Sequence, residues 1–317
     1  MNRYFPITRL EFAVTYLCNS KCRHCQLGEK EERNRFPNCI DKNKAVEITR
    51  KVGRAYHPRS IMTFGGEPLL YPEVVCAIHK EAARTGIPVR EILTNGFWSR
   101  KTEKIQDIAA ALVKSRVNEV SFSVDCFHQE FIPLGLIRKA AESLLSEGMP
   151  RVSWNPCWVI SKHNDNMYNR KTKAILKKLE VLPVRCSDGN NVQPEGRATE
   201  WLKRYLPPKT RTPKGECGDA PYTEPLDSVH TVCVEPDAGI AVCKELHIGN
   251  ASQTDIIDII ENYDPTKTPE TKAIIEEGID GLIRWASKNG VTPESEGYYN
   301  ICHLCTSLRR RVHDHAA

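Results

Sequence analysis

Short apolar segments alternate with longer stretches of helical periodicity through the first two thirds of the chain. The apolar segments are rich in Val, Ile, Phe and Leu, and turn residues follow most of them, so each predicts a β-strand. The predicted strands are Leu10–Thr15, Ser60–Phe64, Val89–Leu93, Asn118–Val124, Arg151–Ile160 and Val181–Arg185. Strands that alternate with helices in this way are typical of parallel βαβ units.

The intervening segments carry apolar residues at intervals of three and four, which predicts amphipathic helices. Asp41 is a suitable N-cap for the first of these helices. The predicted helices are 42–52, 72–84, 101–115, 136–145 and 165–179. Candidate motifs follow most of the strands, which favours an α/β fold with a partial (β/α)6 TIM-like barrel and its site at the carboxyl ends of the strands. A simple open sheet fits the same pattern.

The alternation stops after Arg197, where five prolines lie close together between positions 207 and 225. A hairpin is predicted next, with strands Ser228–Val234 and Ile240–Glu245 joined by a Pro-Asp-Ala-Gly turn. Helices 253–261 and 269–288 follow, and the chain closes with a Cys-x2-Cys motif and a basic tail. We therefore predict two domains, residues 1–200 and a small cysteine-rich domain at 201–317 built from a hairpin and helices.

Composition narrows the class of protein. The chain has 317 residues, 40% hydrophobic and 27% charged, which indicates a folded globular protein. Its net charge of +5 is too small to favour nucleic acid as a partner. No apolar run approaches the roughly 20 residues of a membrane span, and the first residues lack the apolar core of a signal peptide. A cytoplasmic location is expected, where 13 cysteines favour metal binding or redox chemistry over disulfides.

Three of these cysteines, Cys18, Cys22 and Cys25, form a C-x3-C-x2-C run directly after the first predicted strand. Three thiolates can hold three irons of a cubane cluster and leave the fourth iron without a protein ligand. Closed zinc sites and electron-transfer clusters use four protein ligands. The run therefore favours a metal centre with an open position, and a zinc site completed by His24 or by a distant cysteine is the alternative.

The cysteine run and Gly65-Gly66-Glu67-Pro68 resemble the cluster motif and the Gly-Gly-Glu-Pro turn of the radical S-adenosylmethionine enzymes. Weaker matches are Thr94-Asn95-Gly96, Ser123-Val124-Asp125 and 194–198. The resemblance implies a catalytic [4Fe–4S] cluster and S-adenosylmethionine as cofactors, with an electron donor such as flavodoxin or ferredoxin. One electron from the cluster would cleave the cofactor to a 5′-deoxyadenosyl radical, which abstracts hydrogen from a substrate.

The resemblance also assigns roles to residues. Gly65 and Gly66 would let the backbone approach the cofactor closely, and Glu67 would accept from the ammonium group of its methionine. Three of these residues have alternative roles: Asp125 could be a turn or cap residue, Asn155 a core amide and Arg197 a surface residue. The expected cofactor-binding residues are His24, Gly65, Gly66, Glu67, Pro68, Asn95, Ser123, Asp125, Asn155 and Arg197.

The C-terminal cysteines resemble the auxiliary-cluster domains called SPASM or twitch domains. Cys302 and Cys305 would need two more thiolates for a second [4Fe–4S] cluster, and Cys217 and Cys243 are the expected pair. Cys233 is the spare: it could replace Cys217 or give a hydrogen atom to the substrate. Zinc is the alternative metal. The remaining cysteines show no ligand spacing and are expected to be ordinary buried residues: Cys39, Cys76, Cys126, Cys157 and Cys186.

Within this family the chain is most similar to members that modify ribosomal peptides, in particular peptide epimerases. This similarity rests on the segments 95–98 and 125–128 and on the terminal Cys-x2-Cys. Those epimerases carry a Cys-Cys pair in the hairpin, whereas Lys244 follows Cys243 here, so the reaction outcome stays open. The expected substrate is a peptide or protein. A small metabolite and a non-catalytic zinc or iron–sulfur scaffold are the alternatives.

Overall fold

The computed structural model describes residues 2–27, 34–243 and 246–316. The chain divides into two compact units. One comprises Thr8–Tyr205 with Cys233–Ala238, and the other comprises Met1–Ile7, Leu206–Val232 and Gly239–Ala317. The division at 205/206 lies close to the predicted boundary at 200/201, but the first seven residues group with the C-terminal unit. The division into domains 1–200 and 201–317 stays a prediction.

The first unit is built on a parallel sheet whose strands follow chain order. Its strands are β1 (Arg9–Thr15), β2 (Ser60–Gly65), β3 (Val89–Thr94), β4 (Glu119–Ser123) and β5 (Arg151–Asn155). Each pairs in parallel with the next. The predicted α/β class with a partial barrel is confirmed, and these five strands lie within about a residue or two of their expected positions, except at the end of the fifth.

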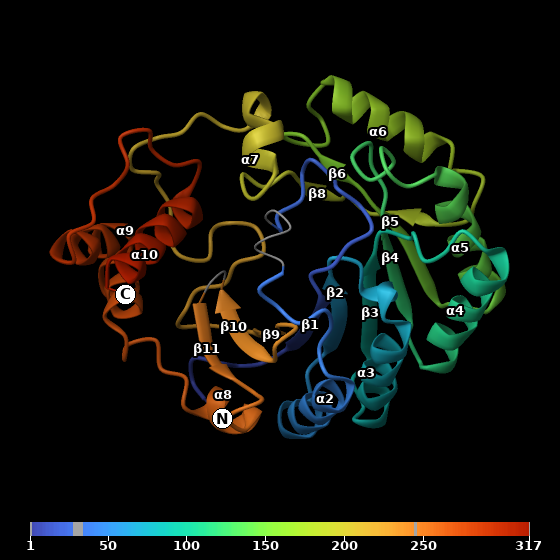
Figure 1. Cartoon of the computed structure of the whole chain (residues 1–317), viewed down its shortest axis with the longest axis horizontal. Coiled ribbons are helices and arrows are strands. Elements are labelled where there is room, and N and C mark those ends of the chain that lie inside the picture. The colour runs from blue at the N-terminus through green and yellow to red at the C-terminus, as the bar shows by residue number, and fades with distance from the viewer. Residues whose placement is uncertain (1, 28–33, 244–245, 317) are drawn as a thin grey trace. The chain divides into compact units, whose positions relative to one another are not determined.

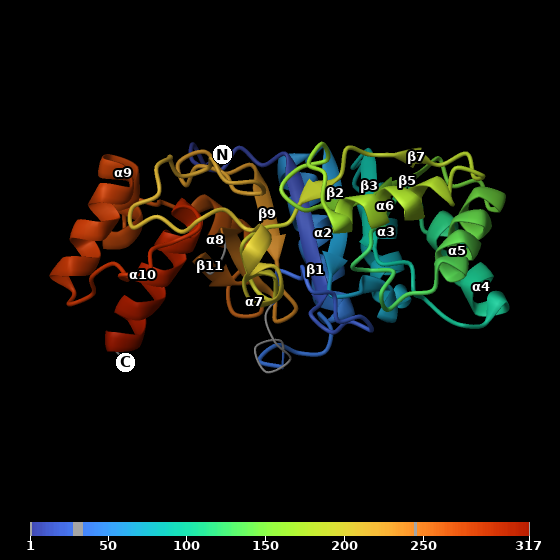
Figure 2. The ribbon, with the colours of Figure 1, turned by 90° about the horizontal axis from the view of Figure 1, so that it is seen from above.

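Helices follow the strands and cover one face of the sheet (Figure 1). They are α2 (Lys42–Tyr56), α3 (Pro72–Arg84), α4 (Thr102–Lys114), α5 (Leu134–Ser146) and α6 (Met167–Lys177). Three short helical segments complete this unit: η1 (Pro68–Leu70), α7 (Ala198–Trp201) and η2 (Lys203–Tyr205). Asp41 caps α2 as predicted, since its carboxylate accepts from the Lys44 N–H at 2.8 Å. Neighbouring helices pack side by side, as α4 and α5 do in both Figure 1 and Figure 2.

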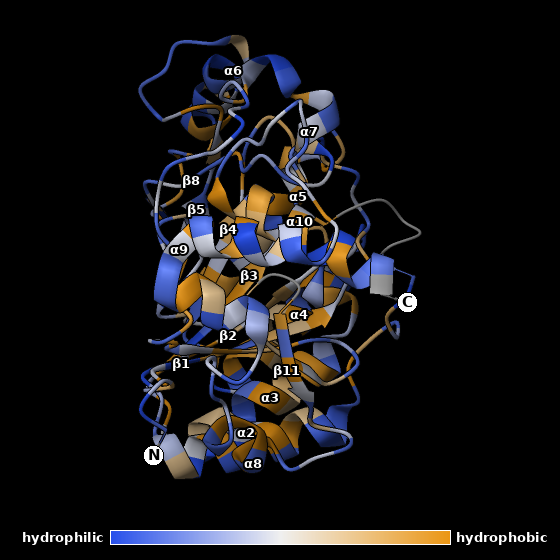
Figure 3. Cartoon of the chain, turned by 90° about the vertical axis from the view of Figure 1, so that its left-hand side faces the viewer, coloured by the Kyte–Doolittle hydropathy of each residue, from blue (hydrophilic) through white to orange (hydrophobic). Residues whose placement is uncertain are grey.

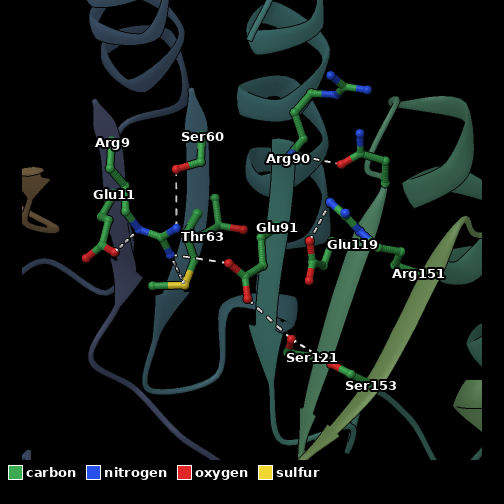
Figure 4. Close-up of polar contacts among 12 residues, drawn as sticks. Arg9, Glu11, Ser60, Thr63, Arg90, Glu91, Glu119, Ser121, Arg151 and Ser153 are labelled. Atoms are coloured by element: carbon green, nitrogen blue, oxygen red, sulfur yellow. Dashed lines mark hydrogen bonds and ion pairs between the residues drawn. The ribbon is translucent and has the colours of Figure 1, made fainter. Parts of the chain in front are cut away.

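The two faces of this sheet differ in chemistry. Alternate residues on the face beneath the helices are wholly buried and apolar: Leu10, Phe12, Ile61, Ile92, Val120 and Phe122. The opposite face carries a polar network (Figure 4). Arg9 donates to Glu11 at 2.5 Å and to Glu91 at 3.3 Å, and the hydroxyl of Ser121 donates to Glu91 at 3.3 Å. These groups satisfy one another, so the network explains how polar residues are accommodated on the second face.

The sixth strand is much shorter than predicted. Strand β5 ends at Asn155, before Pro156, which has no N–H for the ladder. Of the predicted strand Val181–Arg185 only its last residue is extended, as part of β7 (Arg185–Cys186), which pairs with β5. Two further short strands, β6 (Cys157–Trp158) and β8 (Asn190–Asn191), pair with each other in parallel. The prediction at 181–184 was wrong because Val181 is exposed rather than in a core.

The hairpin of the C-terminal region is confirmed as β9 (Thr231–Val234) and β10 (Gly239–Cys243), with a turn in which the Ala238 N–H donates to the Glu235 carbonyl at 2.9 Å. Glu245, the predicted end of the second strand, lies outside the described residues. Strand β11 (Leu246–Asn250), which the sequence analysis missed, pairs antiparallel with β10. Helices α8 (Ile256–Glu261) and α9 (Pro269–Lys288) follow, and α9 is interrupted at Gly278, whose φ is 63°.

The chain closes with helix α10 (Ile301–Ala316), where the sequence analysis expected only a motif and a basic tail. Its buried residues recur at helical spacing: Ile301, Leu304, Leu308 and Val312. Figure 3 shows the resulting mixture of hydrophilic and hydrophobic positions along α10. Among the described residues no helix is long and apolar enough to cross a membrane.

Candidate functional site

The three cysteines of the first motif lie on the loop that follows β1, next to the carboxyl ends of neighbouring strands. The Asn95 amide, after β3, donates to the Cys18 sulfur at 3.6 Å and to the Asn19 side chain at 2.8 Å. The Ser20 hydroxyl lies 3.1 Å from the Cys22 sulfur. Burial, together with Glu67 nearby, raises the pKa of Cys18 to about 11, and the neighbouring thiols add to this effect. Three adjacent thiols of this kind are a donor set that fits an iron–sulfur cluster, which would hold them as thiolates.

His24 lies inside this group of residues rather than on the surface. Its ring stacks on Phe127 with a centroid distance of 4.7 Å and meets the His128 ring edge-on at 4.9 Å. Burial lowers the pKa of His24 to about 4, so the ring is neutral near pH 7. Its Nδ1 is buried without a hydrogen-bond partner in the described structure. His24 therefore packs beside the cysteines, as its expected place near the cofactor requires.

Asp125 is wholly buried after β4, and protein groups use both of its carboxylate oxygens. One oxygen accepts from the N–H groups of Phe127 and His128 at 2.9 and 3.0 Å. The other accepts from the His128 ring at 2.9 Å and from the Cys157 N–H at 3.2 Å. The structure therefore favours the alternative role of Asp125 as a buried turn residue. Its expected contact with the cofactor stays a prediction.

His128 is the residue of this site that the sequence analysis did not assign. Its Nδ1 donates to the Asp125 carboxylate at 2.9 Å, and a ring nitrogen lies within 4.8 Å of the Cys22 sulfur. Although burial alone would lower the pKa of His128, the two acidic neighbours raise it well above its ordinary value. Burial would raise the pKa of Asp125, but the two histidines hold it below its usual range. The spacing Asp-x-x-His directly after a strand was the signal that could have identified the pair.

The two glycines at the end of β2 lie against backbone carbonyl groups at and just after the end of β1. A Cβ on Gly65 would lie 2.2 Å from the Thr15 carbonyl oxygen, and one on Gly66 would lie 2.0 Å from that of Leu17. The Gly66 N–H donates to Thr15 at 2.7 Å and the Glu67 N–H to Leu17 at 2.9 Å. Side chains are therefore excluded here because two segments of backbone approach each other closely. The expected reason was a close approach of the backbone to the cofactor.

Glu67 connects the ends of two strands. Its carboxylate accepts from the N–H of Asn95 at 2.7 Å, the hydroxyl of Thr94 at 2.8 Å and the N–H of Leu69 at 3.0 Å. Burial raises the pKa of Glu67 to about 7, although these donors act in the opposite direction. Pro68 begins the 3-10 turn that Glu67 caps. The proposed contact of Glu67 with an ammonium group stays a prediction.

The backbone of segment 194–198 contacts the cysteine loop. The Arg197 N–H donates to the Cys25 carbonyl at 3.0 Å. A Cβ on Gly196, whose φ is 51°, would meet the same carbonyl oxygen at 2.6 Å. Asn155 ends β5 and accepts from the Ser187 hydroxyl at 2.9 Å, and Ser123 ends β4 beside it. The structure thus brings residues that follow β2, β3 and β4, together with segment 194–198, around the cysteine loop after β1, as expected for a barrel site.

The second group of cysteines lies in the C-terminal unit and surrounds one pocket. Helix α10 supplies Cys302 and Cys305, β10 ends with Cys243, and Cys217 comes from the segment before β9. The rest of the lining is mostly apolar and includes Leu226, Leu246, Ile274, Ile279 and Ile301. Burial raises the pKa of Cys305 to about 12, which Arg309 beside it partly offsets. Four thiols around one pocket are the donor set of a closed cluster or a zinc site.

Cys233 does not line this pocket; it belongs to the first unit, where its charged neighbours are Glu11 and Glu235. Of the two candidates for the fourth ligand, Cys217 is the one that the structure brings to the other three. A hydrogen-donor role for Cys233 stays a prediction. The expectation of ordinary buried cysteines was wrong for Cys186, which is exposed, and the other four of that group are partly buried.

Comparisons with known proteins place this geometry in context. Residues 12–169 match the family model described as the Radical SAM superfamily. GTP 3′,8-cyclase of Chlorobaculum tepidum is 27% identical over 122 residues, which are 38% of this chain and 34% of that protein. The same enzyme of Streptomyces coelicolor is 27% identical over 118 residues, 37% of this chain and 33% of that protein. The matched segment thus spans about a third of the length of these curated relatives.

Two solved structures are similar over nearly the whole chain. Native anSMEcpe with bound AdoMet has a TM-score of 0.52 at 13% identity, covering 98% of this chain and 97% of that one. The histidine-tagged form of anSMEcpe with bound AdoMet gives a TM-score of 0.53 at 14% identity, with 98% and 93% covered. At this level of identity the similarity shows a shared fold.

Proposed function

We propose that this chain, which belongs to the radical SAM superfamily, uses its radical chemistry on a peptide or protein substrate. The family match covers the cysteine loop and the Gly-Gly-Glu-Pro turn, and the chain is a radical SAM enzyme. Cys18, Cys22 and Cys25 would hold the catalytic cluster, and the residues around them would bind S-adenosylmethionine. When bound, these two groups supply the hydrogen-abstracting chemistry.

The observation that carries the peptide proposal is the pocket of four cysteines in the C-terminal unit. Two of these cysteines belong to the terminal Cys-x2-Cys, which is one of the features in which this sequence resembles peptide-modifying members. The protein's own contribution at the first site is to orient the cysteine loop and to exclude water. Both tasks are supported by the packing of Cys22 with Phe127, Val159, Ala198 and Leu202.

A small-molecule substrate is the second candidate, and the similarity to GTP 3′,8-cyclases favours it. That similarity covers little more than a third of this chain. The two candidates differ in which substrate should increase the cleavage of S-adenosylmethionine to 5′-deoxyadenosine.

The test measures 5′-deoxyadenosine formed by the anaerobically reconstituted full chain with S-adenosylmethionine and dithionite. We expect formation to rise at least tenfold with a peptide from short reading frames beside the gene, and the peptide to change in mass or stereochemistry. GTP is assayed in parallel. Stimulation by GTP and by none of the peptides would contradict the peptide proposal. The Cys22→Ala variant, which lacks one cluster ligand, should form no product with either.

A further inference from the structure

A groove of about 450 Å³ lies within the first unit, between the loop that follows β4 and helix α6. Contacts between these two segments hold the groove together. The Cys126 N–H donates to the Thr172 hydroxyl at 3.1 Å, and the rings of Phe127 and Tyr168 lie 5.1 Å apart. The groove is therefore a built feature of this unit, and the function proposed above gives it no role.

The groove borders the candidate site. Arg23, which lines it, lies between Cys22 and Cys25 in the sequence. Phe127 also lines it, and the Phe127 ring stacks on His24 with a centroid distance of 4.7 Å. A peptide that occupied the groove would thus lie next to the cysteine loop.

One face of α6 lines the groove. The residues that it contributes follow helical spacing: Met167, Lys171, Ala174, Ile175 and Lys178. Met167 is 45% exposed, so it offers an apolar contact to a ligand. Lys171 and Lys178 are both exposed and lie seven residues apart. Their backbone positions are therefore separated by about 10 Å along one side of the helix.

The charge of the groove is not balanced by its own residues. Neither Lys171 nor Lys178 forms an ion pair with a carboxylate in the described parts of the chain, and residues 167–179 include no Asp or Glu. Glu130, an acidic residue that lines the groove, is already paired with Arg23 at 2.7 Å. The groove therefore carries a net positive charge, which favours an anionic ligand.

We propose that this groove binds an acidic segment of the peptide substrate, with one carboxylate at Lys171, a second at Lys178 and an apolar contact to Met167. The inference rests on the proposed function in taking a peptide as the substrate. In the polyproline II conformation, residues three positions apart lie on the same side of the chain, about 9 Å from each other. Two acidic residues with this spacing match the separation of the two lysines.

The test is the binding of fluorescein-labelled synthetic peptides to the anaerobically reconstituted full chain, measured by fluorescence anisotropy. The acidic peptide contains Glu-Pro-Pro-Glu, and its neutral counterpart contains Gln-Pro-Pro-Gln. We expect the acidic peptide to bind more tightly to the wild type. Lys171→Gln/Lys178→Gln should weaken its binding about fivefold, because each exposed ion pair contributes only modestly.

Lys173→Gln/Lys177→Gln is the matched control. These two lysines belong to the same helix but do not line the groove, and the variant loses the same charge. Because solvent and salt screen charges outside the groove, the control should weaken binding by less than about twofold. Equal losses in the two variants would indicate a general attraction to α6 and would overturn the inference.

Two further outcomes would contradict the inference. One is equal affinity of the wild type for the acidic and the neutral peptide, or no binding of either. The other comes from a parallel titration with flavodoxin: if Lys171→Gln/Lys178→Gln weakens the binding of flavodoxin and not that of the peptide, the groove belongs to an electron donor. The proposed function fails by a different result, which is that no peptide increases 5′-deoxyadenosine formation by the wild type.

Discussion

At the scale of single residues, the motif positions hold the protein's own loops together. Gly66 allows the backbone after β2 to approach that after β1. Glu67 accepts hydrogen bonds from residues at the end of β3, and Asp125 accepts from N–H groups of the turn after β4. The resemblance alone assigned these residues to the cofactor. Their substitution should therefore affect folding of the loops as well as cofactor binding.

Gly66→Ala tests this directly. The new Cβ would lie 2.0 Å from the Leu17 carbonyl oxygen, a backbone atom that cannot move without disrupting the cysteine loop. We expect the free energy of unfolding of the apoprotein to fall by about 3 kcal/mol or more. Urea unfolding followed by circular dichroism measures it.

Gly135→Ala is the matched control. Gly135 lies in α5, and a Cβ there meets nothing within 4 Å. Alanine is the better helix former by about 0.8–1 kcal/mol, so this variant should be at least as stable as the wild type. Equal stability of the two alanine variants would show that the contact at Gly66 is not as tight as described.

At the scale of elements, the sequence was sufficient wherever periodicity and a boundary signal agreed. Helix α3 begins at Pro72 and ends at Arg84 as predicted, because proline starts it and a glycine turn follows it. The strand at 181–184 failed because a short apolar run does not show whether a core exists to cover it. Helix α10 was not predicted, although its apolar residues recur at helical spacing.

The residues of the candidate site also differ in how far the sequence predicts them. The spacing of Cys18, Cys22 and Cys25 was enough to select the first set of candidate ligands, whereas the sequence left Cys217 and Cys233 as alternatives in the second. The structure brings Cys217, and not Cys233, to the pocket of the other three. The Asp-x-x-His spacing could have identified the Asp125–His128 pair, but not that His128 lies near Cys22, because only the fold brings these two residues together. Backbone contacts such as that of Arg197 with Cys25 could not be predicted, because they do not depend on the chemistry of the side chains.

His79 gives a test of how α3 is anchored. It is wholly buried and lies 3.0 Å from the Thr63 hydroxyl of β2, and burial lowers its pKa to about 3. As pH falls below about 6.5, the unfolded chain binds a proton that the folded chain does not, so stability is lost. The expected loss is about 1.4 kcal/mol per pH unit from this residue between roughly pH 6 and pH 4.

The measurement is the free energy of unfolding of the apoprotein against pH for the wild type and His79→Gln. The variant should be less stable at pH 7.5 and should lose less stability on acidification, so the two curves converge. The exposed His163→Gln should give a curve parallel to the wild type. Parallel curves for all three proteins would mean that His79 takes up its proton without opening the fold.

At the scale of the whole molecule, two cysteine centres lie in two compact units, each built largely from its own segments of chain. Replacing Cys302 and Cys305 by alanine should remove the second centre and leave the first. We expect iron to fall from about eight to about four per chain, while 5′-deoxyadenosine is still formed without substrate. Cys186→Ala, at an exposed cysteine, should change neither quantity. Loss of all iron from the double variant would show that the two centres depend on each other.

The most direct test of the central claim is iron and acid-labile sulfide per chain after anaerobic reconstitution, for the wild type and the Cys18→Ala/Cys22→Ala/Cys25→Ala variant. Two cubane clusters predict about eight irons in the wild type and about four in the variant. About four irons falling to none would leave the C-terminal cysteines to zinc or to free thiols. A wild-type chain that takes up no iron would contradict the account as a whole.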